Sequence, residues 1–64
     1  MDFYFTHNSS VCTLHPETTR AQLWCRDFIN EDAFRYGDSF IMLRKDIESL
    51  IEAIEADGMT GNWL

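Results

Sequence analysis

The sequence predicts an α+β fold, a small two-layer sandwich of β-β-α-β-α order with two helices on one face of a three-stranded sheet. Three observations lead to this fold class. The aromatic N-terminal stretch contains two short β-prone runs, and two later stretches repeat apolar residues at helical spacing. An uninterrupted apolar run separates those two stretches, as expected for a strand that is buried on both faces.

The first fourteen residues predict a β-hairpin with strands near 2–6 and 11–14. Alternation in the first strand places Phe3 and Phe5 on one face. The polar residues 7–10 between the strands are suited to a turn, and they form a loop longer than the two-residue type.

A helix is predicted near 18–29. Pro16 ends the preceding strand, because the residue before a proline avoids helical geometry. Thr19 and Gln22 have the spacing of a capping box, in which each side chain satisfies a free backbone N–H of the other residue. The apolar stripe of this helix consists of Ala21, Trp24, Cys25 and Phe28.

Residues 33–37 are predicted to form a loop with two aromatic side chains, and a short strand turned by Gly37 is the alternative. The third strand follows near 39–43. We place the 2–6 strand in the centre of the sheet, antiparallel to both neighbours, which makes the 11–14 and 39–43 strands parallel to each other.

The second helix is predicted near 46–57, with Asp46 as its N-cap. Gly58 stands where a left-handed stop residue belongs, and Met59 can then contact Ile54. The apolar face of the helix consists of Ile47, Leu50, Ile51 and Ile54, at positions i, i+3, i+4 and i+7.

Length and charge limit the class of protein. Sixty-four residues suffice for a single small globular domain, 1–64, since a chain of this size buries only roughly 60% of its unfolded surface. The net charge is −6, and residues 46–64 carry five acidic residues without a cation. This distribution argues against direct binding to nucleic acid or to an anionic membrane, and it favours a protein partner with a basic surface.

The sequence contains no apolar run that approaches the roughly 18 residues of a membrane span, and its N-terminus lacks a basic start. We therefore expect a cytoplasmic protein without membrane association.

The acidic side of the second helix is the most distinctive predicted surface. Glutamates at i and i+4 repel each other by a few tenths of a kcal/mol in an isolated helix. The surface is either a docking site for a basic partner or a solvated face that keeps the chain soluble. We assign Phe34 to the core and Trp63 to an interface. The predicted partner-binding residues are Glu48, Glu52, Glu55, Asp57 and Trp63.

Metal binding and catalysis are not expected. Cys12 and His15 have a separation that zinc ligands often use, but a second close pair is missing, and Cys25 belongs to an apolar stripe. Serines among the turn residues 7–10 have an ordinary structural explanation, and no known catalytic spacing is present. We therefore expect no cofactor, no metal and no enzymatic activity.

The leading hypothesis is a non-enzymatic protein-interaction module, a modulator or inhibitor that docks on a basic partner surface through an acidic helix. The alternative is a small structural or assembly homodimer, held by aromatic residues, whose acidic face is merely solvated. A more distant alternative is a metal-binding regulator that uses Cys12 and His15. In size, acidity and lack of catalytic motifs, the chain resembles many short proteins carried by bacterial mobile elements.

Overall fold

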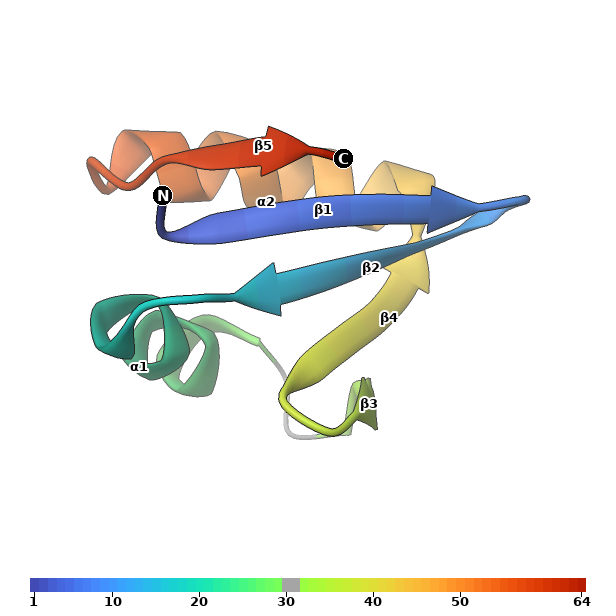
Figure 1. Cartoon of the computed structure of the whole chain (residues 1–64), viewed down its shortest axis with the longest axis horizontal. Coiled ribbons are helices and arrows are strands. Elements are labelled where there is room, and N and C mark those ends of the chain that lie inside the picture. The colour runs from blue at the N-terminus through green and yellow to red at the C-terminus, as the bar shows by residue number, and fades with distance from the viewer. Residues whose placement is uncertain (30–31) are drawn as a thin grey trace.

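A computed structural model describes residues 1–29 and 32–64, and within them the chain forms five strands and two helices (Figure 1). Their order is β-β-α-β-β-α-β. The elements are β1 (Phe3–Asn8), β2 (Val11–Pro16), α1 (Thr19–Phe28), β3 (Phe34–Tyr36), β4 (Ser39–Leu43), α2 (Arg44–Ala56) and β5 (Gly61–Trp63).

The sheet contradicts the predicted three-stranded arrangement, although the α+β class fits. In the described part of the chain it has five strands in the order β3-β4-β2-β1-β5. The pairing is mixed: β5 runs parallel to β1, and the other neighbours are antiparallel. β2 lies between β1 and β4, so the central position predicted for the first strand is wrong. β2 and β4 are antiparallel and not parallel as predicted, because β3 intervenes along the chain.

The predicted loop at 33–37 is wrong, since β3 occupies most of it. β3 forms a hairpin with β4, and Phe34 pairs with Ile41. Gly37 has φ +62° in the connecting turn, a left-handed conformation that glycine adopts without strain. All three β3 side chains are exposed. The strand therefore lacks the alternation of buried and exposed residues that identifies strands in a sequence.

β5 was not predicted, and close packing on β1 explains how it forms. Gly61 pairs with Phe3, and Trp63 pairs with Phe5. A Cβ atom at Gly61 would collide with the ring of Phe5, so glycine permits this approach of the two strands. The backbone N–H of Leu64 then donates to the Phe5 carbonyl at 2.8 Å.

The β1–β2 hairpin is longer and tighter than predicted. Asn8 pairs with Val11, so Ser9 and Ser10 alone form the turn. Ser9 has φ +60°, as a two-residue hairpin turn of the primed types requires at its first position.

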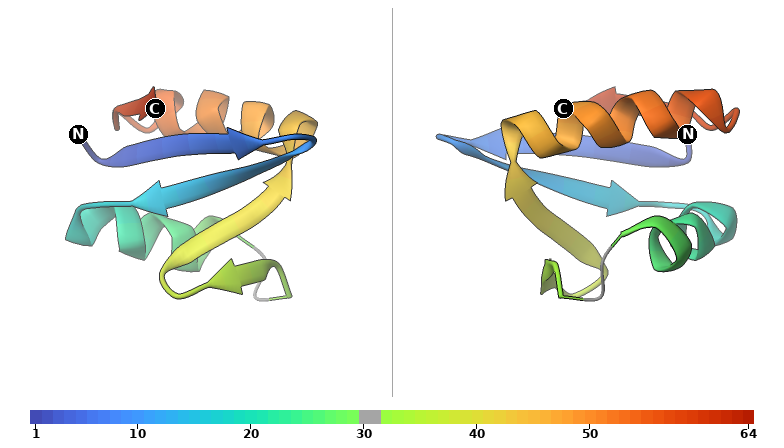
Figure 2. Two further views of the ribbon diagram at one scale, coloured as in Figure 1. Left: turned by 45° about the vertical axis from the view of Figure 1, so that its right-hand side comes forward. Right: turned by 180° about the vertical axis from the view of Figure 1, so that it is seen from behind.

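Both helices lie on one face of the sheet, and the right panel of Figure 2 shows them in front of it. Topology explains this placement. α1 connects the parallel strands β2 and β3, and α2 connects the parallel strands β4 and β5. The two crossovers move in opposite directions across the sheet and leave from strands of opposite orientation. Right-handed crossovers therefore place both helices on the same side.

The N-terminus of α1 is anchored to the start of the chain. Thr18 is the N-cap, one residue before the Thr19 of the predicted capping box, and its Oγ1 accepts from the Ala21 backbone N–H. Thr18 also donates to Asp2 at 2.8 Å, and Arg20 binds both carboxylate oxygens of Asp2. Arg20 holds the pKa of the Asp2 carboxyl well below its usual range.

The N-cap of α2 differs from the prediction, whereas the glycine stop after its C-terminus agrees with it. The helix begins at Arg44, with Leu43 as an N-cap that makes no side-chain hydrogen bond, so Asp46 lies in the first turn and is not the cap. At the other end Gly58 is left-handed at φ +78°, as predicted. The Met59 N–H then donates to the carbonyl of Ile54, a residue buried in the core.

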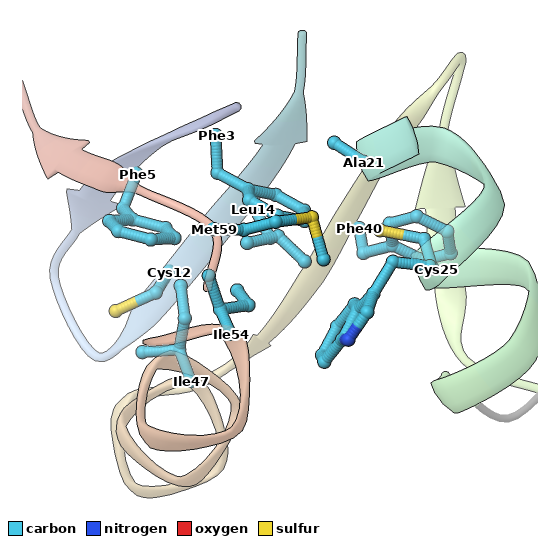
Figure 3. Close-up of a cluster of buried hydrophobic side chains, with 11 residues drawn as sticks. Phe3, Phe5, Cys12, Leu14, Ala21, Cys25, Phe40, Ile47, Ile54 and Met59 are labelled. Carbon is cyan, nitrogen blue, oxygen red and sulfur yellow. The ribbon is translucent and has the colours of Figure 1, made fainter. Parts of the chain in front are cut away.

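The core lies between the sheet and the helices (Figure 3). Alternate residues of the long strands point into it, and each helix contributes its apolar stripe. The buried residues are Phe3, Phe5, Cys12, Leu14, Ala21, Trp24, Cys25, Phe40, Ile47, Ile54 and Met59. Within the described residues, neither helix has the length and apolar character that crossing a membrane requires.

Candidate functional site

The acidic face of α2, formed by Glu48, Glu52 and Glu55, points away from the sheet. Ile47 and Ile54 are fully buried on the opposite side of the helix, which turns the three glutamates toward solvent. Helical rise places the first and last of these carboxylates about 10 Å apart along the axis. The three side chains therefore form one continuous anionic strip.

The charges of α2 run against the helix dipole. Arg44 and Lys45 lie in the first turn, where Asp46 is the one favourably placed anion, whereas Glu55 lies in the last turn and Asp57 is the C-cap. Anions are favoured at the N-terminus of a helix and cations at its C-terminus, so this order destabilises the isolated helix. The helix predicted at 46–57 contains no cation, and this expectation is wrong because the observed helix starts at residue 44 and includes Arg44 and Lys45.

A weak ion pair inside α2 offsets part of the unfavourable interaction between these charges and the helix dipole. Arg44 Nε donates to Glu48 Oε1 at 3.4 Å, and both side chains are more than half exposed. Such an i, i+4 pair contributes roughly 0.2–0.5 kcal/mol. In the described part of the chain, Glu52 and Glu55 have no cationic partner.

Asp57 contacts the other helix. The indole Nε1 of Trp24 donates to Asp57 Oδ2 at 2.6 Å, which joins α1 to the C-terminus of α2. Trp24 is only 6% exposed. A partner that used Asp57 would therefore compete with a hydrogen bond of the folded protein. Glu48 has only the weak, exposed pair with Arg44, and within the described residues Glu52 and Glu55 have no such contact.

Trp63 is half-buried against the core side of the sheet. Its ring lies 5.4 Å from the ring of Phe5 and 6.0 Å from that of His7. The Arg44 guanidinium sits 4.8 Å from the ring centroid of Trp63. Of the predicted binding residues, Trp63 and Glu48 are thus linked through Arg44, at the N-terminal end of the acidic face.

The side of the sheet opposite the helices is open, and we call it the uncovered face. Strand register defines it, because residues alternate between the core and the other side. The uncovered face consists of Tyr4, Thr6, Asn8, Val11, Thr13, His15, Phe34, Tyr36, Ser39, Ile41, Leu43 and Asn62. Asp, Glu, Lys and Arg make up 25% of the chain, yet none occurs among these described strand residues.

Apolar side chains gather on the β3–β4 half of the uncovered face. Phe34 and Tyr36 are 81% and 79% exposed, and Leu43 at the end of β4 is also exposed, as is Val11, its partner on β2. The assignment of Phe34 to the core is therefore wrong. The reason is that β3 is an edge strand whose Phe34 pairs with Ile41, a residue whose side chain points away from the helices.

His15 forms the centre of a polar network on the uncovered face. Its Nδ1 lies 2.7 Å from Ser39 Oγ, and its Nε2 lies 3.4 Å from Thr6 Oγ1. The ring stacks on Tyr4 at 4.2 Å with an interplanar angle of 6°. Desolvation lowers the pKa of His15 below its ordinary 6.5. A serine paired with a histidine is also the start of a nucleophilic site, and such sites usually lie in a concave pocket. Ser39 and His15 line neither the groove beside α1 nor the hollow around Tyr4 and Asn62.

The structure places the side chains of Cys12 and His15 far from a shared metal-binding geometry. Three residues apart on one strand, the two side chains point to opposite faces of the sheet. Cys12 is buried in the core, and His15 lies on the uncovered face. Among the described residues, no three metal-ligating side chains of the Cys, His, Asp and Glu types come together.

A shallow groove of about 450 Å³ lies between α1 and the β3–β4 hairpin. Arg26 and Arg35 line it, and the Arg35 guanidinium sits 4.9 Å from the ring centroid of Phe40. Cys25 also lines the groove, and burial raises the pKa of its thiol to about 11. A thiol with this pKa is protonated at neutral pH, so Cys25 is not an activated nucleophile.

Comparison of the chain with protein-family models, curated proteins and solved structures found no match. The functional argument is therefore carried by the acidic face and the uncovered face. The acidic face follows from helical spacing in the sequence. The uncovered face was missed, although alternation in β1 and β2 already placed Tyr4, Thr6, Thr13 and His15 together, opposite the core residues.

Proposed function

We propose that this chain is a non-enzymatic protein-interaction module that docks on a basic partner surface through the acidic face of α2. The observation that carries the proposal is the charge order of this helix. Two cations at its N-terminus, beside the single favourable anion Asp46, and two anions at its C-terminus oppose the helix dipole. Glu52 and Glu55 gain no ion pair in the described structure. Residues that break a local rule of stability without an internal compensation are expected at functional sites.

The partner surface that fits is a row of lysine or arginine side chains. The acidic strip is convex and exposed, so it suits an extended or concave basic surface. Attraction between such surfaces mainly accelerates association and weakens as salt screens the charges. The proposal places the protein in the cytoplasm, which agrees with two buried cysteines that are free in the structure.

The experiment compares two charge-matched variants. Glu52→Gln/Glu55→Gln removes two charges from the acidic face, and Glu17→Gln/Asp27→Asn removes two exposed charges from the region of α1. Both change the net charge from −6 to −4. Immobilised wild-type and variant chains are used to capture partners at low salt, followed by elution with rising salt.

We expect a partner that the wild type and the α1 variant retain equally, and that the acidic-face variant loses. Equal retention by all three chains would show that the acidic face is only a solvated surface. Equal loss from both variants would show that net charge matters and its position does not. In that case the assembly homodimer with a solvated acidic helix becomes the better account, and the uncovered face is the observation that favours it.

A further inference from the structure

The uncovered face has the composition of an interface core. Interfaces between copies of a chain are depleted of charged residues at their centre and enriched in aromatic residues. Here twelve strand residues of the described chain share one open side without a formal charge, and two aromatic side chains on it are about four-fifths exposed. The acidic face lies on the other side of the molecule, so the argument below does not require the acidic face to bind a partner.

We propose that the uncovered face is the binding surface for a second copy of this chain. The two sheets pack face to face about a twofold axis, which gives a four-layer α/β/β/α dimer. Such an interface is isologous, and each copy buries the same residues. Packed sheets lie about 10 Å apart, close enough for Phe34, Tyr36 and Ile41 of each copy to reach the opposite sheet.

The distribution of charge favours a second copy as the occupant. Two chains with a net charge of −6 repel each other, and a dimer must keep their acidic surfaces apart. Both helices cover the other side of the sheet (Figure 2), so face-to-face packing would place each α2 on the outside of the dimer. The acidic faces are then separated by both sheets, a distance greater than the screening length of about 8 Å at physiological salt. Glu17 lies beside Tyr4 and Asn62 at the edge of this face and acts electrostatically on His15. The twelve strand residues themselves offer a charged partner no complementary charge.

Three polar side chains at the centre of the uncovered face already have hydrogen-bond partners within the sheet. Both ring nitrogens of His15 have hydroxyl partners, Ser39 and Thr6, within the same sheet. A polar group that keeps its hydrogen bond when water is removed avoids most of the desolvation cost. The centre of the face can therefore become dry, while Phe34 and Tyr36 gain the largest apolar contact.

The size of the face limits how stable a dimer can be. The molecule measures 28 × 22 × 17 Å, and Figure 1 views the uncovered face down the shortest axis. The outline of the whole molecule in this view, 28 Å by 22 Å, limits the face to at most about 600 Å² per chain, which is less than the roughly 800 Å² of a standard interface. We expect a dimer that dissociates in the micromolar range, so its population depends on protein concentration.

Analytical ultracentrifugation over a concentration series tests the proposal. The wild type is expected to shift from 7.5 kDa toward twice that mass as concentration rises. The variant Phe34→Thr/Tyr36→Thr keeps the β propensity and the charge of β3, and it should weaken dimerisation at least ~100-fold. The control Leu23→Gln/Phe28→Gln removes exposed apolar side chains from α1, and it should change the dissociation constant less than about threefold.

A second variant separates face packing from pairing of β3 edges. Ile41 lies on β4, inside the sheet, so Ile41→Thr should weaken a face-to-face dimer by roughly tenfold and leave an edge-paired dimer unchanged. Circular dichroism and melting curves verify that each variant remains folded. A wild type that stays monomeric up to about 1 mM, a dimer that survives Phe34→Thr/Tyr36→Thr, or one that Ile41→Thr leaves unchanged would overturn the proposal.

Discussion

The hydrogen bond between Trp24 and Asp57 gives a sharp test of how the two helices are held together. The indole N–H donates to the Asp57 carboxylate at 2.6 Å, and Trp24 is 6% exposed. Asp57→Ala leaves this N–H without its partner, which costs roughly 1–3 kcal/mol. The same change removes an anion from the C-terminus of α2, which returns roughly 0.3–1 kcal/mol.

The net expected loss is therefore about 1–2 kcal/mol in the free energy of unfolding. For a domain of this size, such a loss lowers Tm by roughly 5–15 °C. Asp57→Asn keeps an oxygen acceptor and removes the charge, so its unfolding free energy should stay within about 0.5–1 kcal/mol of wild type. Thermal and urea denaturation, followed by circular dichroism, measure both variants.

Glu55→Gln is the matched control for this experiment. It removes an anion from the last turn of α2 without breaking a hydrogen bond, so it should stabilise the fold by a few tenths of a kcal/mol. If Asp57→Ala is as stable as Glu55→Gln, the hydrogen bond from Trp24 contributes nothing to the free energy of unfolding. This hydrogen bond would then not explain why an acidic residue occupies the C-cap of α2.

Three further predictions concern the turn, the last strand and the histidine network. Ser9→Gly should raise the free energy of unfolding by roughly 0.5–1 kcal/mol in urea denaturation, because φ +60° strains a residue with a Cβ. Gly61→Ala should lower it by roughly 1–3 kcal/mol in the same assay, since the new Cβ displaces the buried Phe5 ring. The unfolded chain binds a proton at His15 more readily than the folded chain, so stability should fall as the pH decreases from 6.5 to the lowered pKa of the folded state. Urea midpoints measured from about pH 7 to 5 should fall less for His15→Gln than for wild type, and equal declines would contradict this role for His15.

The elements with strong periodicity could be predicted from the sequence. Four apolar residues at helical spacing identified α2, and the alternation of Phe3 and Phe5 identified β1. The predicted bounds of both helices differ from the observed ones by no more than two residues at either end. In these segments local pattern and tertiary burial agree, so the pattern alone was sufficient.

The two three-residue strands could not be predicted in this way. β3 exposes every side chain, and β5 begins with Gly61 and Asn62, which have low β propensity. Both strands form because a neighbouring strand offers free backbone groups, which is a tertiary effect. Because the prediction lacked β3 and β5, it placed the first strand, and not β2, at the centre of the sheet.

The candidate surfaces were predictable to different degrees. Helical spacing was enough to expose Glu48, Glu52 and Glu55, and the structure adds that Arg44 belongs to the same helix. The uncovered face depends on strand register and on which side of the sheet both crossover helices occupy. Neither feature can be read from the local sequence. Phe34 illustrates the difference, since an aromatic residue in a small protein is expected in the core and here lies on an edge strand.

The central claim is that the position of the charges on α2, and not their number, determines binding. The most direct measurement is the dissociation constant for the captured partner across a salt series, with wild type, Glu52→Gln/Glu55→Gln and Glu17→Gln/Asp27→Asn. We predict that wild type and the α1 variant share one steep salt dependence, and that the acidic-face variant binds more weakly with a flatter one. An identical affinity and salt dependence for all three chains would contradict the claim.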